Sequence, residues 1–78
     1  MSIPSSVIAK AGELIELYGN QLEYCGVFQG SDVYVFSFPE GKETGFPFLY
    51  LHDVISNSVK EITGFEALHI LSDLKDNN

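Results

Sequence analysis

The sequence predicts an α+β fold in which an N-terminal helix, a four-stranded antiparallel meander sheet and a C-terminal helix follow one another (α-β-β-β-β-α). Apolar residues recur at helical spacing near each end of the chain, and strand-forming residues alternate with turn residues between them. The chain has 78 residues, of which 45% are hydrophobic. That length fits one small domain over residues 1–78, and that composition is sufficient to form a core.

The first helix is predicted over residues 4–18. Pro4 suits the first turn of a helix, and Gly19 supplies a left-handed stop after the last one. Gly12 weakens this helix by about 0.5–1 kcal/mol relative to alanine. The apolar stripe that predicts the helix consists of Val7, Ile8, Ala11, Leu14, Ile15 and Tyr18.

Residues 21–38 are predicted to form a β-hairpin, because they are rich in strand formers on both sides of a glycine. A two-residue loop at Gly30 and Ser31 would form a type II′ turn and place Phe28 opposite Val33. A three-residue loop would change these face assignments, because register and side-chain face are locked together. With the two-residue loop, the opposite face carries Cys25, Val27, Tyr34, Phe36 and Phe38.

The second half of the chain is predicted to contain two strands and a helix. Residues 39–45 hold two glycines, a proline and three charged residues, which predicts an exposed loop. Strands are predicted at residues 46–52 and 58–62, and a helix at about residues 64–74. Residues 75–78 are expected to form a frayed tail.

Two predicted strand segments are apolar at every position, namely residues 33–36 and 48–51. Such runs indicate that both faces of the middle of the sheet are covered. Either the two helices lie on opposite faces of a monomer, or they share one face and another molecule covers the second. In the second case the partner is a second copy in a symmetric homodimer, or another protein. The interaction surface would then consist of Tyr34, Phe36, Phe46, Phe48 and Tyr50.

The charge balance argues against several classes of partner. Eleven acidic residues outnumber four basic ones, the net charge is −7, and all four basic residues are lysines. Binding to nucleic acid or to an anionic membrane relies on clustered basic charge, so neither is expected. The sequence also lacks a run of about 18 apolar residues that could span a bilayer.

The single cysteine, Cys25, cannot form a disulfide within the chain, which agrees with a reducing compartment. The first residues lack the basic stretch and long apolar run of a signal peptide. We therefore expect a cytoplasmic protein.

The search for catalytic or metal-binding residues yields only weak pairs. His52 and Asp53 are adjacent, so their side chains point to opposite faces of a strand. Glu66 and His69 are neighbours on a helix, but a metal site would need further ligands. No nucleophile motif or phosphate-binding loop is present. We expect no catalytic residue, no metal and no cofactor, and therefore a protein that is not an enzyme.

These observations predict a small acidic interaction or regulatory module that self-associates through an aromatic sheet face. One alternative is an inhibitor-like or immunity-like protein that binds a basic partner. Another is a small-molecule-binding domain with a pocket between sheet and helix, or at a dimer seam that includes Tyr34, Tyr50 and His52.

Overall fold

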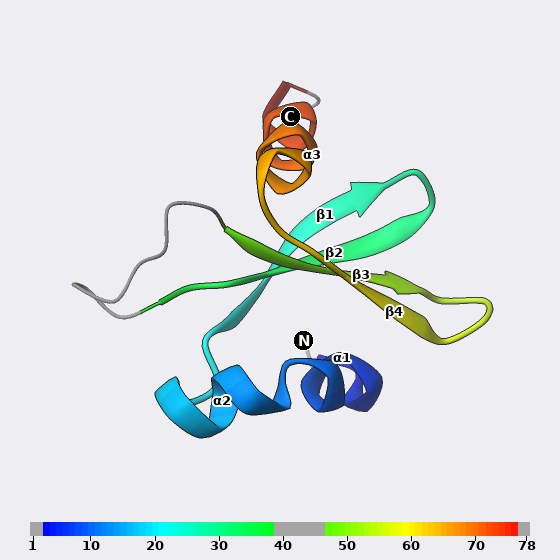
Figure 1. Ribbon diagram of the computed structural model, residues 1–78. Helices are drawn as coiled ribbons and strands as arrows, with labels where there is room; N and C mark the ends of the chain where they lie inside the picture. Colours follow the sequence, from blue (N-terminus) through cyan, green and yellow to red (C-terminus); the bar gives the residue numbers. More distant parts are fainter. Residues whose placement is uncertain (1–2, 39–46, 77–78) are drawn as a thin grey trace.

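A computed structural model describes residues 3–38 and 47–76 (Figure 1). The strands form one antiparallel sheet in the order β1-β2-β3-β4, which confirms the predicted α+β meander. The predicted loop at residues 39–45 and Phe46 lie outside the described residues. The elements are α1 (Ser5–Lys10), α2 (Gly12–Tyr18), β1 (Leu22–Phe28), β2 (Ser31–Phe36), β3 (Phe48–Asp53), β4 (Ser58–Ile62) and α3 (Phe65–Asp76).

The N-terminal segment forms two short helices and not the single helix predicted. Ala11 leaves the helical conformation, with φ −88° and ψ 9°, and Gly12 begins the second helix. Glycine has a low helix propensity, so a break costs little at this point. Only 1% of Ala11 is exposed, because the break packs against the sheet. Gly19 ends α2, as predicted, and its positive φ of 85° favours glycine, but its ψ of 175° is extended and not that of the predicted left-handed stop.

The predicted hairpin is present, and its register differs from the one that a loop at Gly30 and Ser31 would give. The loop consists of Gln29 and Gly30, both with positive φ (50° and 82°), and not of Gly30 and Ser31. Phe28 therefore pairs with Ser31. A non-glycine residue rarely adopts positive φ, which is why the sequence favoured a loop one residue later.

A β-bulge further along β1 shifts the register again. Tyr24 pairs with Tyr34 and Gly26 pairs with Val33, so Cys25 has no partner on β2. Gly26 has φ 130°, a conformation that side chains rarely allow. Because of the bulge, Tyr24 and Val27 lie on the same face of the sheet, the one that α1 and α2 cover, although an odd number of positions separates them.

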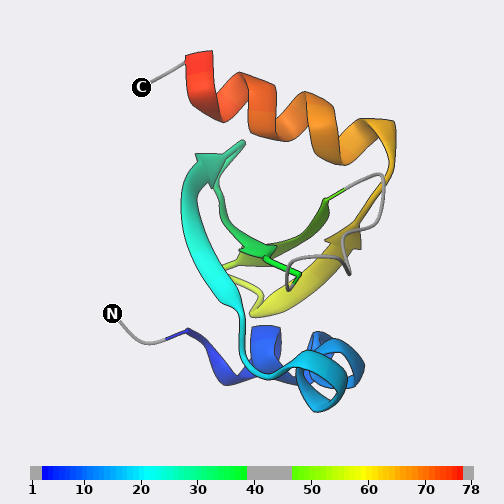
Figure 2. The ribbon, with the colours of Figure 1, turned by 90° about the vertical axis from the view of Figure 1, so that its left-hand side faces the viewer.

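The helices lie on opposite faces of the sheet, with α1 and α2 on one side and α3 on the other (Figures 1 and 2). This arrangement explains the strands that are apolar at every position, because the chain covers both faces itself. The buried residues on the α1–α2 face are Val7, Ala11, Leu22, Tyr34, Phe36 and Tyr50. Those on the α3 face are Val33, Leu49, Ile62, Ala67, Ile70 and Leu74.

Helix α3 is longer than predicted and ends above β1. It includes Lys75 and Asp76, which the sequence assigned to a frayed tail; residues 77–78 lie outside the described residues. The helix crosses the sheet from β4 towards β1 (Figure 2). A Cβ atom on Gly26 would lie 3.5 Å from Cδ2 of Leu74. The last turns of α3 and the bulged strand therefore lie next to each other.

Candidate functional site

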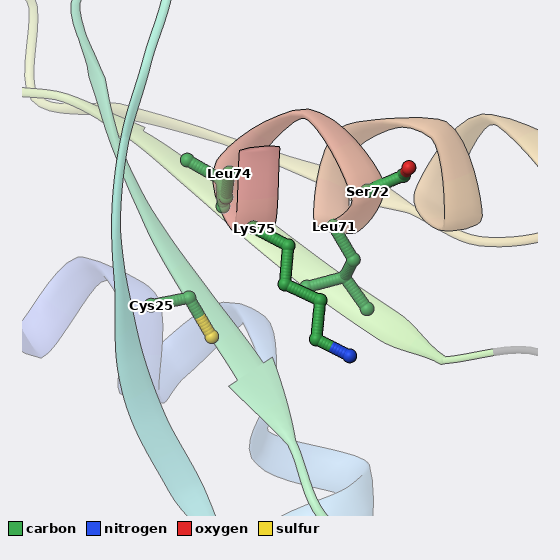
Figure 3. A pocket seen from close by; sticks show the side chains of 5 residues that line it. All are labelled: Cys25, Leu71, Ser72, Leu74 and Lys75. Carbon is green, nitrogen blue, oxygen red and sulfur yellow. The ribbon is translucent and has the colours of Figure 1, made fainter. Parts of the chain in front are cut away.

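A pocket of about 500 Å³ lies between β1 and the last turns of α3 (Figure 3). Small-ligand pockets commonly have volumes of about 300–1,000 Å³. The side chains of Cys25, Leu71 and Lys75 extend from the strand and the helix into the space between them. We call this site the β1–α3 pocket; its lining residues are Cys25, Leu71, Ser72, Leu74 and Lys75.

Two leucine side chains and the Cys25 thiol line this pocket together with two polar residues, Ser72 and Lys75. Burial raises the pKa of the Cys25 thiol, and the carboxylate of Glu23 raises it further. The thiol is 3.8 Å from the carbonyl oxygen of Glu23, to which it donates. Cys25 is therefore a neutral thiol at neutral pH and lacks the lowered pKa of a catalytic cysteine. Lys75 is the charged side chain among the lining residues.

The open edge of β1 is a second candidate site. Within the described part of the chain, β1 pairs only with β2. Residues 24–28 of this strand carry no charge, and Tyr24 and Val27 are 42% and 57% exposed. The other edge strand, β4, carries Lys60 and Glu61 side by side. Charged residues discourage pairing at a sheet edge, and residues 24–28 of β1 carry none, although the bulge at Cys25 interrupts the regular edge there.

The aromatic residues predicted as an interaction surface are largely in the core. Tyr34, Phe36 and Tyr50 are 3%, 2% and 0% exposed, because α1 and α2 cover this face of the sheet. Phe48 is half-buried against the same cluster, and its ring centroid lies 5.4 Å from that of Phe38. These side chains therefore stabilise the packing of the N-terminal helices and do not form an open surface.

Tyr50 also makes a polar contact at the margin of this core. Its hydroxyl group donates a hydrogen bond of 2.8 Å to Oε2 of Glu61. Burial raises the pKa of Tyr50, and the hydrogen bond and the negative charge of Glu61 raise it further. The folded state therefore favours the protonated tyrosine.

This shift in pKa predicts a loss of stability at alkaline pH. The stabilisation is fully present below pH 10, near which an unfolded tyrosine loses its proton, and decreases as the pH rises further. Tyr50→Phe should reduce the slope of this decrease by up to about 1.4 kcal/mol per pH unit. The pKa of Tyr34 is also raised, so part of the decrease in stability with pH should remain in Tyr50→Phe. Urea unfolding between pH 9 and about pH 11.5 measures the effect, and equal slopes for the two proteins would contradict it.

His52, which the sequence suggests as a pocket residue, is also buried. It is 6% exposed, and its Nε2 lies 2.8 Å from Oδ1 of Asn57. The same oxygen accepts a hydrogen bond of 3.1 Å from the hydroxyl group of Ser6, which connects α1 with the turn between β3 and β4. The carboxylate of Asp53 accepts from the backbone amides of that turn. His52 and Asp53 thus have separate structural roles.

Helix α3 holds the other weak pair, Glu66 and His69. Both line a separate cavity with Phe28, Gln29, Ile70 and Asp73. Within residues 3–38 and 47–76, no three His, Cys, Asp or Glu side chains are grouped so that they could hold a metal ion.

The sequence predicts a pocket between sheet and helix only as an alternative, and it assigns none of the residues that line the β1–α3 pocket. One available signal was Gly26, since a glycine inside a strand often marks a bulge or a close approach of another element. None of the helices in the described ranges has the length and apolar character needed to cross a membrane. No protein-family model, curated protein or solved structure matches the chain. The function is therefore inferred from the geometry described above.

Proposed function

We propose that this protein is a small acidic, non-enzymatic interaction module that self-associates by pairing β1 with the β1 strand of a second copy. The observation that supports this proposal is the open and uncharged edge of β1 over residues 24–28. An unprotected edge presents free backbone groups to another strand. The buried aromatic face would be available only if α1 and α2 moved away, so the edge is the better docking element.

A symmetric antiparallel pair would extend the sheet continuously across two copies. Each β1 would become the neighbour of the other, as a twofold interface requires. Tyr24 and Val27 of both copies would then meet on the α1–α2 face. The ring of Tyr24 already packs against that of Tyr34, with centroids 5.6 Å apart, which restricts its orientation before association.

The charge of the chain opposes this association, because each copy carries a net charge of −7. Within β1 the only charged residue is Glu23. Repulsion between the two copies is therefore mostly long-range, and salt screens it. Dimerisation should strengthen as ionic strength rises. A cytoplasmic location is part of the proposal, since a reducing compartment keeps Cys25 as a free thiol.

The proposal predicts that charge at the β1 edge abolishes self-association. Light scattering would compare the wild type with Tyr24→Lys/Val27→Lys at protein concentrations up to about 1 mM. The matched control is Leu17→Lys/Val54→Lys, which adds the same charge at positions that are 71% and 60% exposed. We expect the wild type and the control to reach twice the mass of one chain, and the edge variant to remain at the mass of one chain.

Two outcomes would contradict the proposal. A wild type that remains a monomer over the whole concentration range would exclude self-association. An edge variant that dimerises as well as the control would place the interface elsewhere on the molecule.

A further inference from the structure

We infer that the β1–α3 pocket binds a small amphipathic carboxylate, with its alkyl chain against Leu71 and Leu74 and its carboxylate at Lys75. This inference concerns a ligand and does not rest on self-association. The pocket lies on the α3 face of the sheet, whereas Tyr24 and Val27 lie on the opposite face.

The apolar part of the pocket is built by the approach of α3 to β1. Leu74 is 8% exposed and packs over Gly26, while Leu71 is half-buried beside it. A Cβ atom on Gly26 would be in ordinary contact with Cδ2 of Leu74, at 3.5 Å, so the helix lies directly against the strand. The strand contributes the uncharged thiol of Cys25 to the same cavity. An alkyl chain in this cavity would leave water for an apolar surrounding, which favours binding in proportion to its length.

The polar part of the pocket selects the charge of the ligand. Lys75 supplies an ammonium group, whereas the hydroxyl group of the neighbouring Ser72 is turned away from it (Figure 3). The protein as a whole carries a net charge of −7 and repels anions, so a carboxylate gains a favourable contact only beside a local cation. A cationic amphiphile would place its charge next to that of Lys75. The lining therefore complements an alkyl carboxylate better than an alkyl ammonium ion.

The single cysteine provides a direct readout of occupancy. Cys25 is the only cysteine in the sequence and lines the pocket, so the rate of its labelling by N-ethylmaleimide reports on this site alone. Octanoate, octanol and octylammonium would be titrated separately during labelling. We expect octanoate to protect Cys25 at a concentration about 1.5–5-fold lower than octanol, as for an exposed ion pair, and octylammonium to protect least. Lengthening hexanoate to octanoate should lower the protective concentration by up to about 15-fold.

Two lysine substitutions test whether Lys75 is the residue that contacts the carboxylate head group of the ligand. Lys75→Met removes the charge and keeps an apolar side chain; it should abolish the preference for octanoate over octanol while octanol still protects. Lys60→Met removes the same charge at a residue that lines a different cavity, and it should leave the preference intact. The titrations would be repeated in Tyr24→Lys/Val27→Lys, so that the result holds whether or not the protein dimerises.

Several results would overturn the inference. Octanoate that does not protect Cys25, or that protects no better than hexanoate, would exclude binding of the alkyl chain in this pocket. A preference for octanoate that persists in Lys75→Met, or that is lost equally in Lys60→Met, would exclude Lys75 as the contact for the carboxylate.

Discussion

Truncation of Phe36 to alanine is expected to lower the free energy of unfolding by about 3–5 kcal/mol. Phe36 is 2% exposed and packs in the cluster that α1 and α2 cover, with its ring centroid 6.4 Å from that of Tyr18. Leu49→Ala should cost about 2–5 kcal/mol on the other face, where α3 covers it. Domains of this size have total stabilities of only about 0.05–0.15 kcal/mol per residue. Either substitution should therefore remove much of the stability.

Urea unfolding measures both effects, with Leu17→Ala as the matched control. Leu17 is 71% exposed, so its truncation should change the stability by less than about 0.5 kcal/mol. If a truncated protein is too unstable to measure, Phe36→Leu gives a smaller cavity at the same position. If Phe36→Ala costs no more than Leu17→Ala, then α1 and α2 do not cover this face of the sheet.

Gly26→Ala is expected to destabilise the protein by about 1–3 kcal/mol. A Cβ atom at this position would meet only Leu74, at an ordinary contact distance of 3.5 Å, so space is available. The cost arises from φ, which is 130° at Gly26 and lies in a region that alanine rarely adopts.

The matched control for this substitution is Gly12→Ala. Gly12 begins α2 with nothing within 4 Å of an added Cβ, so the same change should stabilise the protein by about 0.4–1 kcal/mol. If the bulge exists as described, urea unfolding should show that the two substitutions change the free energy of unfolding in opposite directions. A neutral effect at Gly26 would mean that β1 continues without a bulge.

The sequence predicts the local elements of this fold well, because each depends on signals within a few residues. Strand β4, at residues 58–62, has the bounds that its sequence predicts. The sequence leaves the hairpin register open, because the register depends on whether one residue, Gln29, adopts a left-handed conformation. The bulge at Cys25 then shifts the pairing a second time, and a one-residue shift exchanges the two faces of a strand.

The candidate sites form where elements that are distant in the sequence meet. Local sequence patterns indicate such contacts less clearly than they indicate single helices and strands. The apolar strands indicate that both faces are covered, but the pattern is the same whichever helix covers each face. The β1–α3 pocket requires the crossing direction of α3, which no local pattern encodes. Lys75 illustrates the point, because the sequence predicts a frayed tail at this position, whereas in the structure Lys75 lines the pocket from the last turn of α3.

Amide hydrogen exchange across β1, at low and at high protein concentration, tests the proposed self-association most directly. Pairing of β1 between two copies predicts that protection of residues 22–28 rises with concentration. Residues 58–62 of the other edge strand should keep the same protection, and they serve as the internal reference. Protection of β1 that does not depend on concentration, or a rise confined to β4, would contradict the account.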